Sequence, residues 1–351
     1  MSHPPIIRPR KLRRGDRIAV VASSWGGPAT CPERYEQGKR QLAAAFGLDV
    51  VEMPHALKPA DWLARNPQAR ADDLMQAFAD PAIAGIISAI GGEDSIRLLR
   101  HLDFEVIRKH PKVYMGYSDS TVSHLACYKA GLGSFYGPSI MSGFAENGGL
   151  HDYLRLSVQR LLFEDGPAGE IRPNPDGWVV EQYDWSDVAS LTRPRPLNAP
   201  LLWRYLRGQG VVRGHLLGGC LEVLDMLRGS RCWPSLAQWQ GAILFLETSE
   251  DAPAPSMLRY FLRNLAEQGV LQGLQGILLG RPGGKLAPSR FVEYDEALLQ
   301  VLDEEGLTEL AVVTHMDFGH TDPMCVLPYG VMVEIDCDAQ RISLVESATL
   351  P

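Results

Sequence analysis

The stretch Lys112-Val-Tyr-Met-Gly-Tyr-Ser-Asp-Ser-Thr121 (KVYMGYSDST) joins a short apolar run to Gly116, Ser118 and a helix-like segment. A strand, a tight turn at glycine and a serine before a helix form a setting in which hydrolases expose a nucleophile, because N–H groups at the helix start stabilise an oxyanion. Position 120 is Ser, where the usual G-x-S-x-G elbow has a second glycine. Locally, Ser118 or Asp119 is more simply interpreted as the helix N-cap. A nucleophile at Ser118 therefore requires a base, a carboxylate and an oxyanion site from elsewhere in the chain.

Strand and helix signals alternate along the first half of the chain. Such alternation predicts a parallel sheet wrapped by helices, with ligands bound at the carboxyl ends of the strands. We therefore expect an α/β domain of flavodoxin- or Rossmann-like type over residues 1–165. The predicted strands cover residues 17–23, 49–53, 84–90 and 112–115, and the predicted helices cover residues 32–46, 71–79, 94–102 and 119–130.

A change of composition near the middle of the chain predicts a second domain. At 351 residues the chain is long enough for two average domains. Six prolines punctuate residues 166–200, which suits a linker or an irregular excursion between domains. Residues 201–351 then form a C-terminal mixed α/β domain. Its predicted strands cover residues 241–246, 276–279 and 310–314, with a closing hairpin over 330–335 and 342–345, and its predicted helices cover residues 256–268 and 294–304.

The composition argues against several classes of partner. A formal net charge of -8 disfavours a nucleic acid polymer, because neutralising phosphates requires a basic surface. We interpret the basic cluster over residues 8–17 as a solvated segment. No run approaches the roughly 20 apolar residues that cross a bilayer, and the first apolar run, at 18–22, does not resemble a secretory signal. The six cysteines show no C-x-x-C spacing, so we expect reduced thiols, a cytoplasmic location and no membrane partner.

Glu247 is the strongest candidate for the carboxylate. It follows five consecutive apolar residues, 242–246, and should therefore emerge at the carboxyl end of a buried strand. A charge at that place costs free energy unless it is paired, which favours a functional or ion-paired role. Glu250 and Asp251 are rivals further along the loop, and a simply solvated Glu247 remains the alternative.

His320 is the strongest candidate for the base among the nine histidines. It lies in the loop Asp317-Phe-Gly-His-Thr-Asp-Pro323, which glycine and proline bound and which follows a predicted strand. His315 is the competitor, and we expect it to be packed. The side chains of His315, Asp317, His320 and Asp322 also leave a metal site open, although the loop lacks the spacing of metalloprotease helices.

Two glycine-rich segments are candidate anion sites. Gly91 and Gly92 can present backbone N–H groups to an oxyanion or a phosphate, with a plain tight turn as the alternative. The segment 281–285 (RPGGK) lacks the spacing of a phosphate-binding P-loop, and no G-x-G-x-x-G follows the first predicted strand. We therefore expect no nucleotide cofactor, and we favour a site without metal.

Five motifs in this order resemble the LD-carboxypeptidase family of serine peptidases, and in particular its microcin-immunity, MccF-like branch. Each motif alone is modest, but the resemblance extends over nearly the whole chain. The motifs are R-x-G-D-x-I-A-V-V-A-x-S at 13–24, G-Y-S-D-x-T at 116–121, G-x-L-x-G-G-x-L at 214–221, L-F-L-E at 244–247 and G-H-T-D-P at 319–323.

The resemblance implies a role for each candidate. Ser118 would be the nucleophile, His320 the general base and Glu247 the carboxylate that orients it. The backbone N–H groups of Gly92 and Asp119 would form the oxyanion hole, acting where charge develops in acyl transfer. Because the serine and the other two residues come from different domains, we expect the active site in the inter-domain cleft. The resemblance also implies a homodimer.

The first glycine loop and two tryptophans bear on the substrate. The loop 90–95 (IGGEDS) resembles the Gly-Gly-Asp-Asp-Ser of the microcin branch rather than the Arg-Gly-Gly-Tyr-Gly of many murein LD-carboxypeptidases, which makes Gly91 and Glu93 candidate substrate-binding residues. In the microcin branch an aromatic side chain is implied to stack on a nucleotide base. Trp185 and Trp203 are both candidates for that role.

We therefore expect a two-domain serine peptidase or amidase that cleaves an amide bond near a terminal carboxylate through an acyl-enzyme. The substrate would be a murein peptide or a microcin-type peptidyl- or aminoacyl-nucleotide. Two alternatives stay open. One is a metal-dependent hydrolase that uses the 315–322 loop, and the other is a non-catalytic protein that binds a small ligand.

Overall fold

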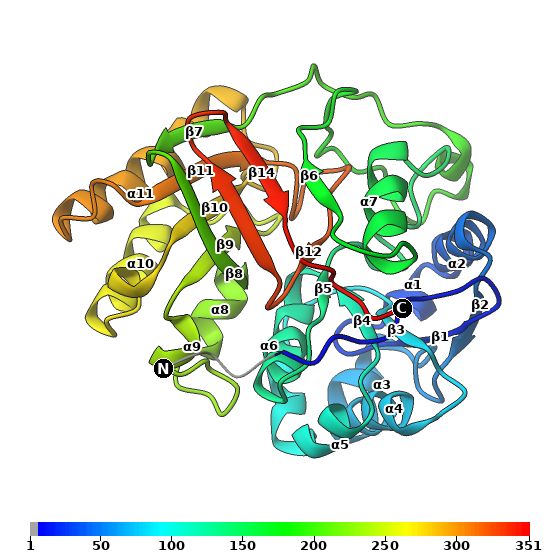
Figure 1. Ribbon diagram of the computed structural model, residues 1–351. Helices are drawn as coiled ribbons and strands as arrows, with labels where there is room; N and C mark the ends of the chain where they lie inside the picture. The colour runs from blue at the N-terminus through cyan, green and yellow to red at the C-terminus, as the bar shows by residue number, and fades with distance from the viewer. Residues whose placement is uncertain (1–5) are drawn as a thin grey trace.

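Two β-sheets organise the chain in the computed structural model, which describes residues 6–351 (Figure 1). The first sheet has the strand order β12-β5-β4-β3-β1-β2. Its strands β1 to β5 run parallel, and β12 pairs antiparallel with β5 at the edge. The strands of this sheet are β1 (Arg17–Val21), β2 (Asp49–Glu52), β3 (Gly85–Ser88), β4 (Val113–Gly116), β5 (Phe135–Tyr136) and β12 (Leu327–Pro328).

The helices of the first half have local sequence signals at their ends. Helix α2 begins at Pro32, whose fixed φ suits the first helical position, and Gly47, with a φ of 67°, caps its C-terminus after Phe46. The 3-10 helix η2 connects β4 directly to α6, so the chain turns sharply after residue 116. The helices are α1 (Gly27–Thr30), α2 (Pro32–Phe46), α3 (Ala60–Arg65), α4 (Pro67–Ala79), η1 (Ser95–His101), α5 (Phe104–Lys109), η2 (Ser118–Ser120), α6 (Thr121–Lys129) and α7 (Asp152–Leu162).

The second sheet is mixed, with the strand order β6-β14-β13-β8-β9-β10-β11-β7. Strands β8 to β11 run parallel at its centre, and antiparallel strands flank them on both sides. Strand β9 is buried along its whole length, which agrees with its continuous apolar run. The strands are β6 (Gly169–Ile171), β7 (Arg204–Arg207), β8 (Val211–Cys220), β9 (Ala242–Glu247), β10 (Gly276–Gly280), β11 (Ala311–Met316), β13 (Met332–Asp336) and β14 (Arg341–Leu344).

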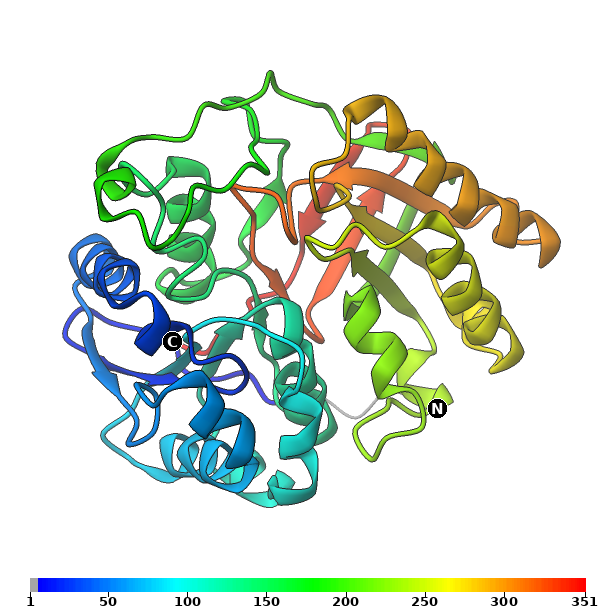
Figure 2. The ribbon, with the colours of Figure 1, turned by 180° about the vertical axis from the view of Figure 1, so that it is seen from behind.

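Helices α10 and α11 lie side by side over one face of the second sheet, as the view from behind shows (Figure 2). Apolar residues of both helices, such as Leu262 and Leu298, are fully buried. Within residues 6–351, no helix combines the length and apolarity needed to cross a membrane. The remaining helices are η3 (Val188–Thr192), α8 (Leu221–Leu227), α9 (Leu236–Trp239), α10 (Pro255–Glu267), η4 (Leu271–Gly273), η5 (Pro288–Arg290) and α11 (Val292–Glu304).

The predicted fold class, a parallel N-terminal sheet followed by a mixed C-terminal α/β part, is confirmed. The helix over residues 32–46 and the C-terminal hairpin are found where they were predicted. The segment predicted as a helix over residues 94–102 is a 3-10 helix instead. Helix α7 and the two-residue strand β12 were missed. The predicted domain boundaries stay a prediction; in the structure β6 joins the second sheet and β12 joins the first.

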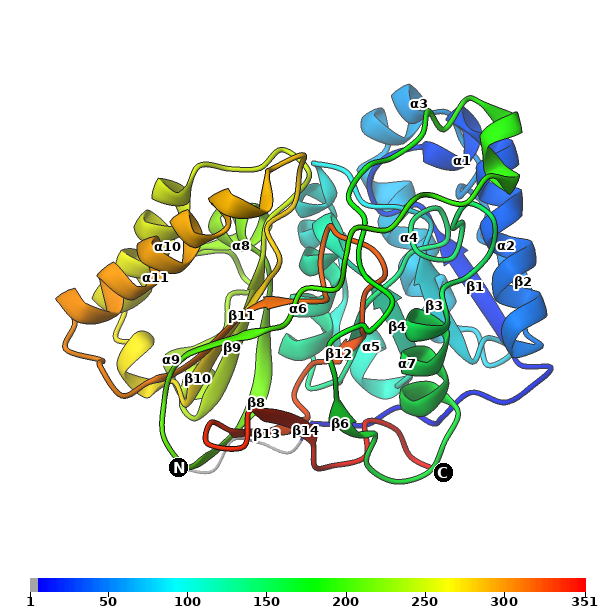
Figure 3. The ribbon, with the colours of Figure 1, turned by 90° about the horizontal axis from the view of Figure 1, so that it is seen from above.

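The segment over residues 166–200 runs across both halves, and the view from above shows it reaching over α1 and α2 before it returns to β7 (Figure 3). Arg195 of this segment is buried and forms ion pairs with two carboxylates. Glu146 belongs to the first half, and Asp322, whose oxygen lies 2.8 Å from the guanidinium, follows β11 of the second half. The guanidinium therefore ties together three parts of the chain that are distant in sequence.

We expect Arg195→Met to lower the free energy of unfolding by about 3–5 kcal/mol, because it leaves two buried carboxylates without a cation. Urea unfolding followed by circular dichroism measures the change. The control is Arg172→Met, which removes an ion pair whose guanidinium is 75% exposed, and little effect is expected there. Equal effects of the two substitutions would contradict a structural role for the buried cluster.

Candidate active site

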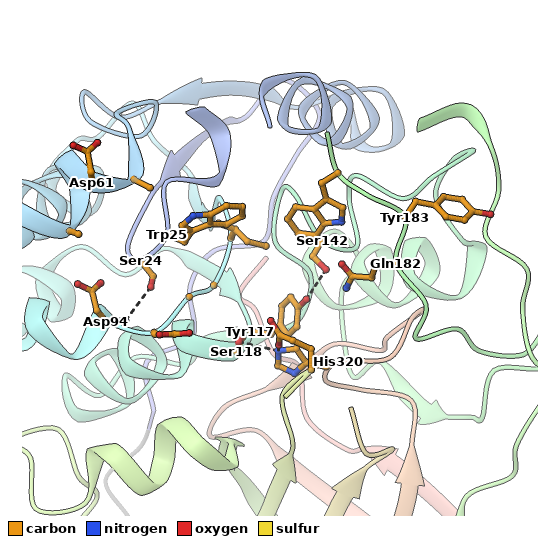
Figure 4. A pocket seen from close by; sticks show the side chains of 18 residues that line it. Ser24, Trp25, Asp61, Asp94, Tyr117, Ser118, Ser142, Gln182, Tyr183 and His320 are labelled. Carbon is orange, nitrogen blue, oxygen red and sulfur yellow. Dashed lines mark hydrogen bonds and ion pairs between the residues drawn. The ribbon is translucent and has the colours of Figure 1, made fainter. Parts of the chain in front are cut away.

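Three side chains from three strand ends meet in one line of contacts. Ser118 follows β4, Glu247 is the last residue of β9, and His320 lies in the loop after β11. The Nε2 atom of His320 lies 3.0 Å from Ser118 Oγ, and its Nδ1 atom lies 2.6 Å from Glu247 Oε2. Figure 4 shows Ser118 and His320 side by side at one end of a cavity. The structure thus brings together the hydroxyl, the imidazole and the carboxylate that the sequence singled out.

The turn at Ser118 holds its hydroxyl away from the helix that follows. Ser118 itself has a φ of 60°, a conformation that costs free energy for a residue other than glycine. Gly116 is required because Ser120 packs closely against it: a Cβ atom at position 116 would lie 2.7 Å from Ser120 Oγ. No side chain caps η2 or α6, so the interpretation of Ser118 or Asp119 as an N-cap is wrong. Strained backbone of this kind is typical of a nucleophile elbow.

Glu247 is fully buried, and two side chains satisfy its oxygens. His320 contacts Oε2, and the hydroxyl of Tyr136, at the end of β5, donates to Oε1. The same hydroxyl accepts a hydrogen bond of 3.0 Å from the backbone N–H of Ser118. Tyr136 therefore connects the buried carboxylate directly to the serine turn. No sequence signal indicates this tyrosine, because it lies in a strand of two residues outside every motif.

The loop that carries His320 is fixed by a buried ion pair on its other side. Arg281 binds Asp317 at 2.7 Å and Thr321 at 3.1 Å, and all three side chains are buried. Gly319, with a φ of 94°, packs against Glu247, and a Cβ atom at that glycine would lie 2.6 Å from Glu247 Cβ. The imidazole is thus held by its own loop and not only by its contacts in the site.

The charge of His320 depends on two carboxylates. Burial lowers the pKa of the ring, but the carboxylates of Glu247 and Glu250 outweigh burial and raise the pKa to about 10. Glu250 Oε2 lies 3.1 Å from Nε2, the same nitrogen that contacts Ser118. The hydrogen bond from His320 in turn lowers the pKa of Glu250 to about 2. In the free protein the imidazolium form is therefore favoured at neutral pH.

The Gly91–Gly92 loop packs directly on the serine. A Cβ atom at Gly91 would lie 3.0 Å from Ser118 Cβ, so a larger side chain there would displace the hydroxyl. Gly92 has a φ of 144°, and a Cβ atom at that position would lie 2.3 Å from Ser24 Oγ. Asp119 is fixed next to this loop, because its carboxylate accepts a hydrogen bond from the Ser95 N–H at 2.9 Å.

The cavity beside Ser118 has a volume of about 890 Å³. Gly91, Gly92, Glu93 and Trp185 line it together with the serine and the histidine. The Trp185 ring lies 6.2 Å from that of Trp25, centroid to centroid. The structure separates the two candidate tryptophans, because Trp203 is buried away from the cavity and donates to Asp317 at 2.8 Å. Trp203 packs in the interior and is not placed to contact a ligand in this cavity.

The four side chains considered for a metal site do not converge. His315 lies 3.2 Å from Asp295, Asp317 binds Arg281, Asp322 binds Arg195, and His320 faces Ser118 and Glu247. Across residues 6–351, no group of three or more His, Cys, Asp or Glu side chains is arranged to hold a metal ion. The donor geometry therefore does not support the metal-dependent alternative.

A serine, a histidine and a buried carboxylate are in contact at strand ends of the two sheets, which is the arrangement that serine hydrolases use. Comparison with family models agrees with this class. Residues 18–137 match the LD-carboxypeptidase N-terminal domain, and residues 213–335 match the LD-carboxypeptidase C-terminal domain. The chain belongs to the LD-carboxypeptidase family of serine peptidases.

Similar proteins that match nearly the whole chain include both a microcin-immunity protein and a murein peptide carboxypeptidase. The microcin C7 self-immunity protein MccF of Escherichia coli is 31% identical, over 98% of this chain and 97% of its own. The “probable murein peptide carboxypeptidase” of Bacillus subtilis strain 168 is 26% identical, over 97% of this chain and 94% of its own. The sequence thus resembles both a microcin-immunity protein and a murein peptidase.

Solved structures of MccF-like proteins share the fold. A MccF-like protein from Streptococcus pneumoniae in complex with AMP has a TM-score of 0.82 and 31% identity, and the match covers 94% of this chain and 98% of that one. The microcin C7 self-immunity protein MccF in complex with aspartyl sulfamoyl adenosine has a TM-score of 0.84 and 28% identity, covering 98% and 100%. The predicted family is therefore confirmed.

We expect Tyr136→Phe to lower kcat by about 10- to 100-fold with little change in KM, because it removes a hydrogen bond to a buried carboxylate and frees the serine turn. Steady-state kinetics and the pH profile of kcat/KM measure the effect. The matched control is Tyr35→Phe, which removes a hydrogen bond of 2.9 Å to the carboxylate of Glu52, far from the site. A purely structural role would give both variants the same loss of stability and leave kcat unchanged.

Proposed function

We propose that this chain hydrolyses an amide bond through an acyl-enzyme on Ser118, with His320 as the general base and Glu247 as the carboxylate that orients it. The observation that carries the proposal is the unbroken line of contacts from Ser118 Oγ through both nitrogens of His320 to Glu247, at 3.0 and 2.6 Å. A serine hydrolase needs these contacts, because the serine hydroxyl is a weak nucleophile without a base.

The reaction follows from these contacts. Neutral His320 takes the proton of Ser118 through Nε2 while Oγ attacks the carbonyl carbon, and the imidazolium then gives that proton to the leaving amine. Water attacks the acyl-enzyme with the same assistance and releases the acid. The N–H groups of Gly92 and Asp119 are the proposed oxyanion donors. Glu247, which accepts from Nδ1, stabilises the imidazolium and fixes the tautomer.

The proposed substrates are a microcin-type aminoacyl- or peptidyl-nucleotide and a murein peptide. The first is favoured by the position of Trp185 in the cavity and by the AMP and aspartyl sulfamoyl adenosine bound in the MccF-like structures. The second is supported by the Bacillus subtilis relative. Both have an amide bond close to one end of the molecule: near the terminal carboxylate in the murein peptide, and next to the nucleotide part in the aminoacyl-nucleotide. The cavity volume is large enough for either.

Labelling by a fluorophosphonate tests the chemistry before the substrate is known. We expect the wild type to be labelled, in EDTA as in buffer, and Ser118→Ala to lose the label and at least a thousand-fold in turnover. Ser289→Ala, at an exposed serine of η5, is the control and should keep both. Labelling of Ser118→Ala would contradict Ser118 as the nucleophile, and loss of turnover in EDTA would argue for the metal-dependent alternative. Ligand binding without turnover of any conjugate would favour the non-catalytic one.

Trp185→Ala should raise KM for an aminoacyl sulfamoyl adenosine by about 10-fold, because stacking on a base is worth about 1–3 kcal/mol. Trp185→Phe, which keeps an aromatic ring, should retain most of the affinity. Cleavage of a murein tetrapeptide should respond much less to either change. An equal rise of KM for both substrate classes would contradict base stacking by this residue.

We also propose a cytoplasmic location and a homodimer. All six cysteines are free in the structure, and five of them are buried, which suits a reducing compartment. Cell fractionation and sedimentation equilibrium test the two proposals independently of the chemistry.

A further inference from the structure

Apart from His320, the charged side chains that line the cavity are all acidic. They are Asp61, Glu93, Asp94 and Glu250, and no lysine or arginine joins them in the lining formed by residues 6–351. A substrate group of negative charge would therefore meet no side-chain cation except His320, whose ring is already paired with Glu247 and Glu250. A substrate group of positive charge would meet carboxylates on several sides.

Two of these carboxylates are already neutralised by neighbouring cations. Asp94 binds the buried guanidinium of Arg70 at 2.6 Å, and Asp61 binds Arg65 at 2.7 Å on the surface. Glu93 and Glu250 remain. Glu250 shares the single imidazolium of His320 with Glu247, so one negative charge stays in excess beside the reacting groups. The negative charge available to a substrate is thus concentrated next to Ser118.

Glu250 competes with Ser118 for a single atom. Its Oε2 lies 3.1 Å from His320 Nε2, and Ser118 Oγ lies 3.0 Å from the same nitrogen. While Nε2 carries a proton and donates it to Glu250, that nitrogen has no lone pair to accept the proton of Ser118. The serine is therefore not activated in this arrangement. A group that draws Glu250 away from the ring would release the base.

The backbone next to Glu250 is fixed, but its carboxylate is accessible. The N–H and hydroxyl of Ser249 both donate to Glu222, at 3.0 and 2.5 Å, which anchors the loop. The Glu250 side chain is nevertheless 69% exposed and faces the cavity. A ligand can thus bind this carboxylate without displacing the loop.

We propose that the site selects substrates whose acyl part carries an ammonium group, and that this group binds Glu250 in place of His320. The inference rests on the proposed function and deepens it, since it names the charge of the substrate and the residue that selects it. Binding of the ammonium group orients the scissile bond and removes the carboxylate that holds the Nε2 proton of His320. That proton then leaves to solvent water, and neutral Nε2 can accept the proton of Ser118. An acyl part with a carboxylate is repelled by Glu250 and leaves His320 engaged. Glu250 is in this sense a specificity-determining residue.

The ammonium group has two possible sources, the α-amino group and a basic side chain. Four sulfamoyl adenosine conjugates separate them: lysyl, norleucyl, N-acetyl-norleucyl and glutamyl. A lysyl-over-norleucyl preference assigns the side chain, and a norleucyl-over-N-acetyl-norleucyl preference assigns the α-amino group. We expect at least one of these preferences to reach 10-fold in kcat/KM, and the glutamyl conjugate to be cleaved at least 10-fold less well than the norleucyl one.

Glu250→Gln should reduce these preferences to less than about threefold, and Glu250→Lys should favour the glutamyl conjugate. Asp251→Asn is the matched control, because it removes the same charge from the next residue, which does not line the cavity, and it should keep the wild-type ratios. The groups facing His320 are Glu247, Glu250, Ser118 and the Tyr117 ring. Glu250→Gln removes a charge that stabilises the imidazolium, so the acid limb of kcat/KM for the norleucyl conjugate should move to lower pH.

The outcomes separate the inference from the proposed function. Cleavage of all four conjugates with equal efficiency by the wild type would overturn the charge selection and leave the serine chemistry intact. Preferences that persist in Glu250→Gln would overturn the role of this residue. Failure of the wild type to react with a fluorophosphonate, or to cleave any conjugate or murein tetrapeptide, would overturn the proposed function and this inference with it.

Discussion

The rest of this structure depends on one constraint: a carboxylate buried at the end of a central strand must have hydrogen-bond partners. Glu247 has no exposed surface, so its charge is tolerated only because His320 and Tyr136 both hydrogen-bond to it. Tyr136 ends β5 of the first sheet, whereas His320 lies in the loop after β11 of the second sheet. Tyr136 also holds the backbone of Ser118. The need to satisfy one buried charge therefore sets the relative positions of the strand ends that form the cavity.

Much of this arrangement was predictable from the sequence, since apolar runs mark the strands and Ser118, Glu247 and His320 each follow one. Residue pairing across sheets was not predictable. Tyr136 lies in a strand too short to have a periodicity, and only its place beside β4 and opposite β9 gives it two partners. Trp185 and Trp203 could not be told apart, because the segment over 166–200 has little regular structure and nothing local indicates which ring is buried.

Two buried arginines hold the histidine loop from behind. Arg281 binds Asp317 before the histidine, and Arg195 binds Asp322 after it, so both ends of the loop are fixed by charge pairs. Arg195 reaches Glu146 in the first half as well. Removing a cation of this kind leaves carboxylates in the interior, which makes the loop position costly to change. The precision of a 3.0 Å contact between Ser118 and His320 is thus maintained by residues outside the cavity.

Ser118 follows β4 of the first sheet, whereas Glu247 and His320 belong to the second half, so neither half contains all three side chains. With the proposed roles of these residues, each half produced as a separate polypeptide would be inert towards an amide. Recovery of hydrolysis on mixing would then report that the two pieces have reassociated. The chain could thus serve as a split enzyme in which the rate of hydrolysis measures association.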